Sequence, residues 1–125
     1  MSAKLWAAMK TKDSWLRALA GDDSVRQHVI ACLDAVCAFP GVSQVMVFGS
    51  YAKGTQTAMS DLDVAVFLHA AADDNLLPAF RTLTKICLKA PVEIQVQVFS
   101  ETELLSPCGI VEEIVKFGVP YEKHT

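Results

Sequence analysis

Two acidic residues of this chain have the type and the spacing that suit chemistry. Asp61 and Asp63 are separated by one residue at the start of an apolar segment, so in a strand their side chains leave the same face. Two carboxylates held side by side repel each other unless a cation lies between them. Hard divalent ions such as Mg²⁺ prefer carboxylate and phosphate oxygens. The spacing therefore predicts a site for a divalent cation.

A glycine–serine pair precedes these acids, directly after the segment 44–48, whose residues predict a strand. Ten residues separate Ser50 from Asp61. Gly49 allows the backbone to approach a ligand closely, and the free N–H groups at the start of a helical turn bind anions such as phosphate. The two motifs together predict a phosphate cradle that faces a metal site.

Glu93 is the candidate for a third acid at this site. The segment 92–99 alternates between apolar and mostly polar residues, as a strand with one buried face does, and Glu93 is the acid on its polar face. With three carboxylates, the site would hold two Mg²⁺ ions. One ion would lower the pKa of an attacking hydroxyl, and the other would orient a triphosphate and stabilise the leaving pyrophosphate.

The remaining pattern predicts the elements that position these residues. Apolar residues at helical spacing predict helices, and alternation predicts strands. The expected helices cover 2–19, Asp22 or Asp23 to Pro40-Gly41, 73–90, and Ser106-Pro107 through Phe117, with a short helical turn over 51–54. The expected strands cover 44–48, 62–68, 92–99 and 119–122. This order predicts an α/β (α+β) fold with a mixed central β-sheet flanked by helices.

Length and composition set the frame for this fold. The chain has 125 residues, 52% hydrophobic and 20% charged, which is typical of one globular domain over 1–125. The net charge of -3, without a basic cluster, argues against DNA or another polynucleotide as substrate. No apolar run is long enough to span a membrane, and charges interrupt the first twenty residues, so we expect neither an anchor nor a secretory signal. The four cysteines lack metal-ligand spacing and are expected to be reduced thiols of a cytoplasmic protein.

Gly49-Ser50, ten intervening residues and Asp61-Leu62-Asp63 resemble the signature of the polymerase-beta-type nucleotidyltransferase superfamily. The chain looks most like the minimal nucleotidyltransferases of bacteria and archaea, over a family core at 43–121, with 1–22 as an N-terminal helical extension. The resemblance implies that Gly49 and Ser50 bind a nucleoside triphosphate and that Asp61 and Asp63 bind magnesium.

Two further positions follow from the resemblance less directly. Lys53 stands where the family often has a basic residue that contacts phosphate. Glu93 departs from the usual aspartate of minimal members, although aminoglycoside-modifying relatives use glutamate. Glutamate reaches one methylene further, which alters the expected metal geometry.

The implied reaction is transfer of a nucleoside monophosphate, AMP from ATP in the first instance, to a hydroxyl acceptor with release of pyrophosphate. Minimal members are commonly antitoxins encoded beside a helical HEPN toxin, and some adenylylate that toxin, so the expected partner is such a protein or a second copy of the chain. Two alternatives stay open. One is a binding module that masks a toxin without catalysis, and the other is a small-molecule transferase of the aminoglycoside type.

The N-terminal apolar stretches allow two interpretations. Leu5 to Met9 and Trp15 to Leu19 lie outside the family core. They would either form a contact with a partner, since aromatic residues are enriched at interfaces, or pack on their own domain.

Overall fold

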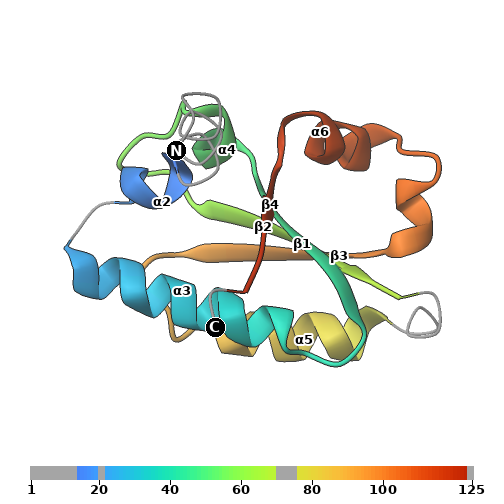
Figure 1. The fold of residues 1–125 in the computed structure, drawn as a ribbon, viewed down its shortest axis with the longest axis horizontal. Coiled ribbons are helices and arrows are strands. Elements are labelled where there is room, and N and C mark those ends of the chain that lie inside the picture. The colour runs from blue at the N-terminus through green and yellow to red at the C-terminus, as the bar shows by residue number, and fades with distance from the viewer. Residues whose placement is uncertain (1–13, 20–21, 70–75, 124–125) are drawn as a thin grey trace, which may run out of the picture.

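Four strands form one mixed sheet in the order β3-β2-β1-β4 (Figure 1). The structure is a computed structural model that describes residues 14–19, 22–69 and 76–123. Its strands are β1 (Val42–Phe48), β2 (Leu62–Leu68), β3 (Ile94–Ser100) and β4 (Val119–Tyr121). This arrangement confirms the mixed central sheet flanked by helices that the sequence predicts.

The directions of the strands decide where their ends meet. β1 pairs antiparallel with both β2 and β4, whereas β2 and β3 are parallel. The C-terminal end of β1 and the N-terminal ends of β2 and β3 therefore lie together at the same end of the sheet. In the interior strand β2, residues 64–68 are buried on both faces, which is why this segment is almost wholly apolar.

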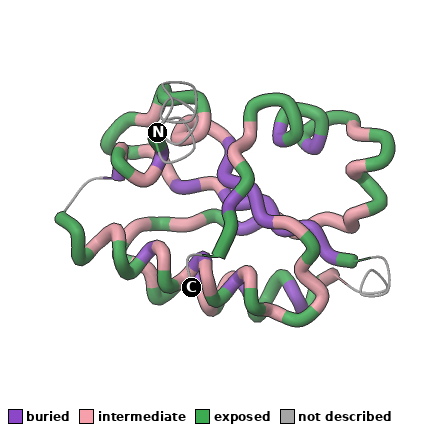
Figure 2. Tube along the Cα trace, viewed as in Figure 1, coloured by how far each residue is buried: buried purple, intermediate pink, exposed green. Residues whose placement is uncertain are grey.

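Helices α3 (Asp23–Cys37) and α5 (Leu76–Cys87) cover one face of the sheet (Figure 1). The side chain of Asp22 caps α3 by accepting from the backbone N–H groups of Ser24 and Val25, as the sequence predicts. Apolar side chains of both helices pack against the sheet and form the larger core, which runs through the centre of the molecule in Figure 2. It includes Val29, Leu33, Val36, Leu62, Val64, Val66, Leu83 and Cys87.

The N-terminal helix α2 (Ser14–Ala18) joins this same core. Trp15 and Leu19 are only 3% and 2% exposed, and the Trp15 ring meets Tyr121 edge-on at 6.1 Å. The Tyr121 hydroxyl in turn donates to Asp34 of α3 at 2.6 Å. The structure thus decides between the two interpretations for Trp15 to Leu19 in favour of packing on the chain's own domain. Leu5 to Met9 lie outside the described residues.

A smaller set of elements covers part of the opposite face. Helix α6 (Gly109–Phe117) buries Val111 and Ile114 against Met46 and Phe67 of the sheet. The short 3-10 helix η2 (Glu101–Leu104) follows β3 directly, and Phe99 stacks on Phe67 at 5.4 Å. Asp63, on the same face of β2 as Phe67 but near the strand's beginning, is only half-buried. The face of the sheet is therefore closed toward the end of β2 and open at its start.

Several boundaries differ from those expected. β1 begins at Val42, and β3 begins at Ile94 after the turns that follow α5. The 3-10 helix η2 was not predicted, and α6 begins at Gly109 with Cys108 as its N-cap, later than Ser106-Pro107. The described part of the helix expected at 73–90 ends at Cys87, and residues 73–75 lie outside the description.

The four cysteines are free thiols, as expected. None of the helices within the described ranges has the length and apolarity that crossing a bilayer requires.

Candidate active site

The candidate residues gather where β1 ends and β2 begins. Phe48, the last residue of β1, pairs with Asp63, so Gly49 and Ser50 follow immediately beside the two aspartates. Asp61 directly precedes β2, and Asp63 is its second residue. The structure therefore brings together the two motifs that the sequence separates by ten residues.

Gly49 lies against the carboxylate of Asp63. A Cβ added at Gly49 would overlap Oδ2 of Asp63 and would lie 3.2 Å from its Cγ. The φ of Gly49 is 74°, a conformation that side chains other than glycine rarely adopt. Gly49 is the N-cap of the single-turn helix α4 (Ser50–Lys53). Both the backbone conformation and the lack of space explain why the residue after β1 is glycine.

The two carboxylates interact unfavourably with each other. Partial burial raises the pKa of Asp63 above its ordinary value, and the negative charge of Asp61 raises that pKa further. A cation between the two side chains would offset both effects, so this pair fits one divalent cation by its chemistry. Within the described residues, no group of three or more histidine, cysteine, aspartate or glutamate side chains is arranged to hold a metal.

Gln95 is the neighbour of the aspartates that sequence reasoning did not single out. It pairs with Asp63 in the parallel β2–β3 register, and its Nε2 donates to Oδ2 of Asp61 at 3.0 Å. The alternating pattern of residues 92–99 places Gln95 on the polar face, but that pattern alone does not state which polar residue lies opposite Asp63. Only the register of β3 against β2 identifies Gln95 as the residue opposite Asp63.

Glu93 lies at the margin of the site. It precedes β3 and is exposed, and its backbone oxygen accepts from the N–H of Leu62 at 2.9 Å. Glu93 also lines a cavity of about 520 Å³ between the start of β3 and helix α5. The same cavity is lined by Phe80, Thr84, Leu88 and Gln95. The structure does not join Glu93 to Asp61 and Asp63 in a metal-holding group. Its role as a third ligand stays a prediction.

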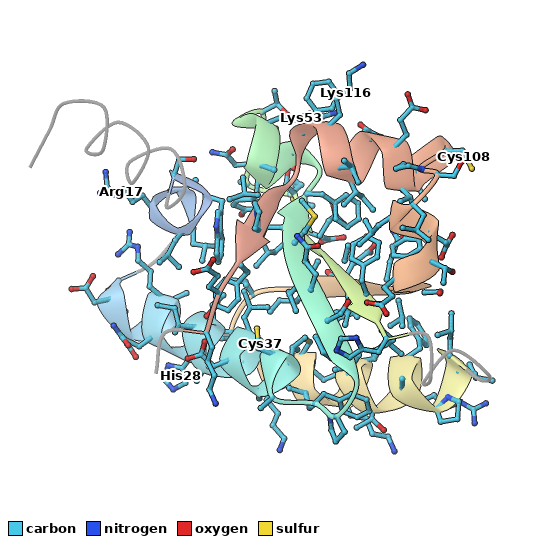
Figure 3. All side chains as sticks on the ribbon, turned by 45° about the vertical axis from the view of Figure 1, so that its right-hand side comes forward. Arg17, His28, Cys37, Lys53, Cys108 and Lys116 are labelled. Atoms are coloured by element: carbon cyan, nitrogen blue, oxygen red, sulfur yellow. The ribbon has the colours of Figure 1, made fainter. Side chains whose placement is uncertain are left out.

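Lys53 is engaged by helix α6. Its ammonium group forms an ion pair with Glu113 and lies 5.1 Å from the centre of the Phe117 ring. Lys116 lies 5.9 Å from the same ring, and Figure 3 shows the two lysines at the top of the molecule. A contact between Lys53 and a phosphate, which the sequence predicts, would require Lys53 to leave Glu113.

The fold of the chain is similar to the folds of solved structures. It resembles a protein of Sulfolobus solfataricus assigned to the nucleotidyltransferases, with a TM-score of 0.58 and 19% identity over 94% of this chain and 87% of that one. A toxin-antitoxin structure with AMP-PNP is similar at a TM-score of 0.47 and 24% identity, over 73% of this chain and 70% of that one. No curated protein matches the sequence.

A family comparison adds the decisive finding. The sequence profile of the family described as "Nucleotidyltransferase domain" matches residues 29–118. This range begins within α3, earlier than the expected core at 43–121, and it contains Gly49, Ser50, Asp61 and Asp63. Because the profile covers more than half of the chain, the chain belongs to the nucleotidyltransferase domain family.

Proposed function

We propose that this chain is a magnesium-dependent nucleotidyltransferase that moves a nucleoside monophosphate, AMP from ATP in the first instance, onto a hydroxyl group. The observation that carries the proposal is the junction of Gly49 with Asp63, which sets the Gly49-Ser50 turn against a pair of carboxylates. Family membership and the open face of the sheet at this point agree with it.

Each residue of the junction has a defined task in this proposal. The backbone of Gly49 and the N–H and hydroxyl groups of Ser50 bind the triphosphate. Asp61 and Asp63 hold a magnesium ion, which when bound neutralises charge on the phosphates. The acceptor oxygen forms a bond to the α-phosphorus while the bond to the pyrophosphate oxygen breaks, and the hydroxyl proton passes to water. The protein contributes position and electrostatics to this transfer.

The proposed acceptor is a hydroxyl on another protein, such as a HEPN toxin, or on a second copy of this chain. The support comes from the resemblance to minimal nucleotidyltransferases and from the exposure of the site. Phe80 and Leu88 are 40% and 76% exposed and line the cavity that extends from Gln95. They offer an apolar surface beside the start of β3, on the α5 side of the sheet, on which a partner would lie.

Nucleotide binding without transfer is the second candidate function. One observation favours it: the residue in register with Asp63 is Gln95, an uncharged amide, so the described residues supply two carboxylates at the junction and no third. Such a protein would bind a magnesium nucleotide and act on its partner by contact alone.

One experiment separates the two candidates. The purified chain is incubated with α-labelled ATP, Mg²⁺ and the product of the neighbouring gene, and both label transfer and pyrophosphate release are measured. A transferase labels the partner or itself, and Asp63→Asn abolishes the labelling while the variant remains folded. Binding of ATP without label or pyrophosphate would leave only the binding function, and equal labelling by Asp63→Asn would reject this site.

A further inference from the structure

We propose that this site holds one divalent cation with its nucleotide and that Gln95, not Glu93, is its third residue. The inference rests on the proposed function, because it specifies how the same site takes its metal. It departs from the two-ion site that three carboxylates would form.

The position of Gln95 follows from the sheet. In the parallel register, Asp63 lies opposite Gln95, and side chains that lie opposite each other share a face of the sheet. Gln95 is also tied to the other carboxylate, because its Nε2 donates to Oδ2 of Asp61 at 3.0 Å. One side chain thus neighbours both aspartates.

An amide at this position changes what the site can hold. The bond from Nε2 occupies a lone pair of Asp61 and fixes its orientation, but it adds no negative charge. Two metal ions about 3.5–4 Å apart repel each other and need carboxylates between them. Turning the amide to present its oxygen to a metal would give up the bond to Asp61. Asp61 and Asp63 with the triphosphate therefore satisfy one cation and leave a second without a further carboxylate of the protein.

Glu93 does not supply the missing charge in the described structure. It comes two residues before Gln95, which is one pleat or roughly 6.6 Å earlier along the strand. Like Gln95 it is exposed, and among the described residues it belongs to no group able to hold a metal. Although the Glu93 backbone lies beside the start of β2, the described structure does not bring its carboxylate into a metal-holding group with the aspartate pair.

The test counts metal ions. Manganese(II) bound to the full chain is measured by electron paramagnetic resonance in the presence of excess α,β-methylene-ATP, which binds but is not cleaved at that bond. We expect one Mn²⁺ per protein–nucleotide complex in the wild type and in Glu93→Gln. We expect two in Gln95→Glu, which places a carboxylate where the amide lies. Gln97→Glu is the matched control, because it adds the same charge one pleat further along the same face, and it should remain at one.

The outcomes separate the inference from the function on which it rests. Two ions in the wild type, falling to one in Glu93→Gln, would overturn the inference while leaving the proposed function intact. One ion in both the wild type and a folded Gln95→Glu would also overturn it, because the amide would then not limit the count. No Mn²⁺–nucleotide complex in the wild type would reject the proposed function and, with it, this inference.

Discussion

Gly49 and Asp63, fourteen positions apart in the sequence, touch so closely that a single added carbon at Gly49 would displace the carboxylate. Gly49→Ala should therefore weaken binding of Mg²⁺ and ATP strongly. It should also lower stability by about 1–3 kcal/mol, because a φ of 74° with a ψ of -150° is essentially confined to glycine. Calorimetric titration and chemical denaturation measure the two effects.

Gly54 provides a control for the close contact. Its φ is also positive, at 76°, but its ψ of 19° places it in the left-handed α region, and nothing lies within 4 Å of an added Cβ. Gly54→Ala should lose about 1–2 kcal/mol of stability, as alanine does in the left-handed conformation, and keep its affinity for the nucleotide. Equal affinity in both variants would show that the contact between Gly49 and Asp63 does not matter for binding.

The raised pKa of Asp63 implies that its ionised carboxylate destabilises the folded, metal-free protein. A carboxyl group whose pKa is higher in the folded state than in the unfolded chain destabilises the fold once it is ionised. The cost is absent at low pH, where both states are protonated, and it is complete above the folded pKa. In chelator, Asp63→Asn should therefore melt above the wild type at pH 7, and this gain should shrink as the pH falls through the acidic range. A variant that melts at a lower temperature than the wild type at pH 7 would show that the ionised Asp63 carboxylate does not destabilise the fold.

Lys53 forms an ion pair with Glu113 of α6, and the proposed contact with a phosphate would compete with that pair. Glu113→Gln removes the carboxylate that holds it, so ATP affinity should rise modestly, by a few-fold at low salt, as expected for an exposed ion pair worth at most about 1 kcal/mol. Lys53→Met should lower the affinity. Lys116→Met is the control, since Lys116 lies over the same Phe117 ring, and it should leave affinity unchanged. If Lys53→Met and Lys116→Met bind ATP equally well, Lys53 has no role at the phosphates.

Trp15 tests whether α2 belongs to the domain. Its side chain is buried against Tyr121, so Trp15→Ala should cost about 3–5 kcal/mol of stability, measured by chemical denaturation. Leu105→Ala, at a side chain that is 86% exposed, should cost almost nothing. A Trp15→Ala variant as stable as the wild type would mean that α2 does not pack as described.

The sequence predicts those features that depend on local pattern. Residues 64–68 are apolar throughout, and they form most of the interior strand β2. The short acidic side chain of Asp22 caps α3 at the expected position. Gly49 and Asp63 were expected to lie near each other, because a strand that ends in Gly-Ser and a strand that begins with two acids are adjacent in the chain.

Features that depend on long-range pairing were not predictable in the same way. Glu93, Gln95 and Gln97 share one alternating face, and only the pairing with β2 selects Gln95 as the neighbour of Asp63. The burial of Trp15 likewise depends on β4, more than a hundred residues further on. The 3-10 helix η2, in contrast, had a readable signal, because Ser100 and Glu103 form a capping box.

Because β2 and β3 pair in parallel, the length of the segment between α5 and β3 determines which residue lies opposite Asp63, and so the charge at that position. Because side chains alternate with a period of two, a shift of β3 by two residues would keep its apolar residues toward the helices. The same shift would replace Gln95 opposite Asp63 by Glu93 in one direction or by Gln97 in the other. A two-residue change in the segment between α5 and β3 can therefore exchange the neutral residue opposite Asp63 for an acidic one without any substitution in the strand.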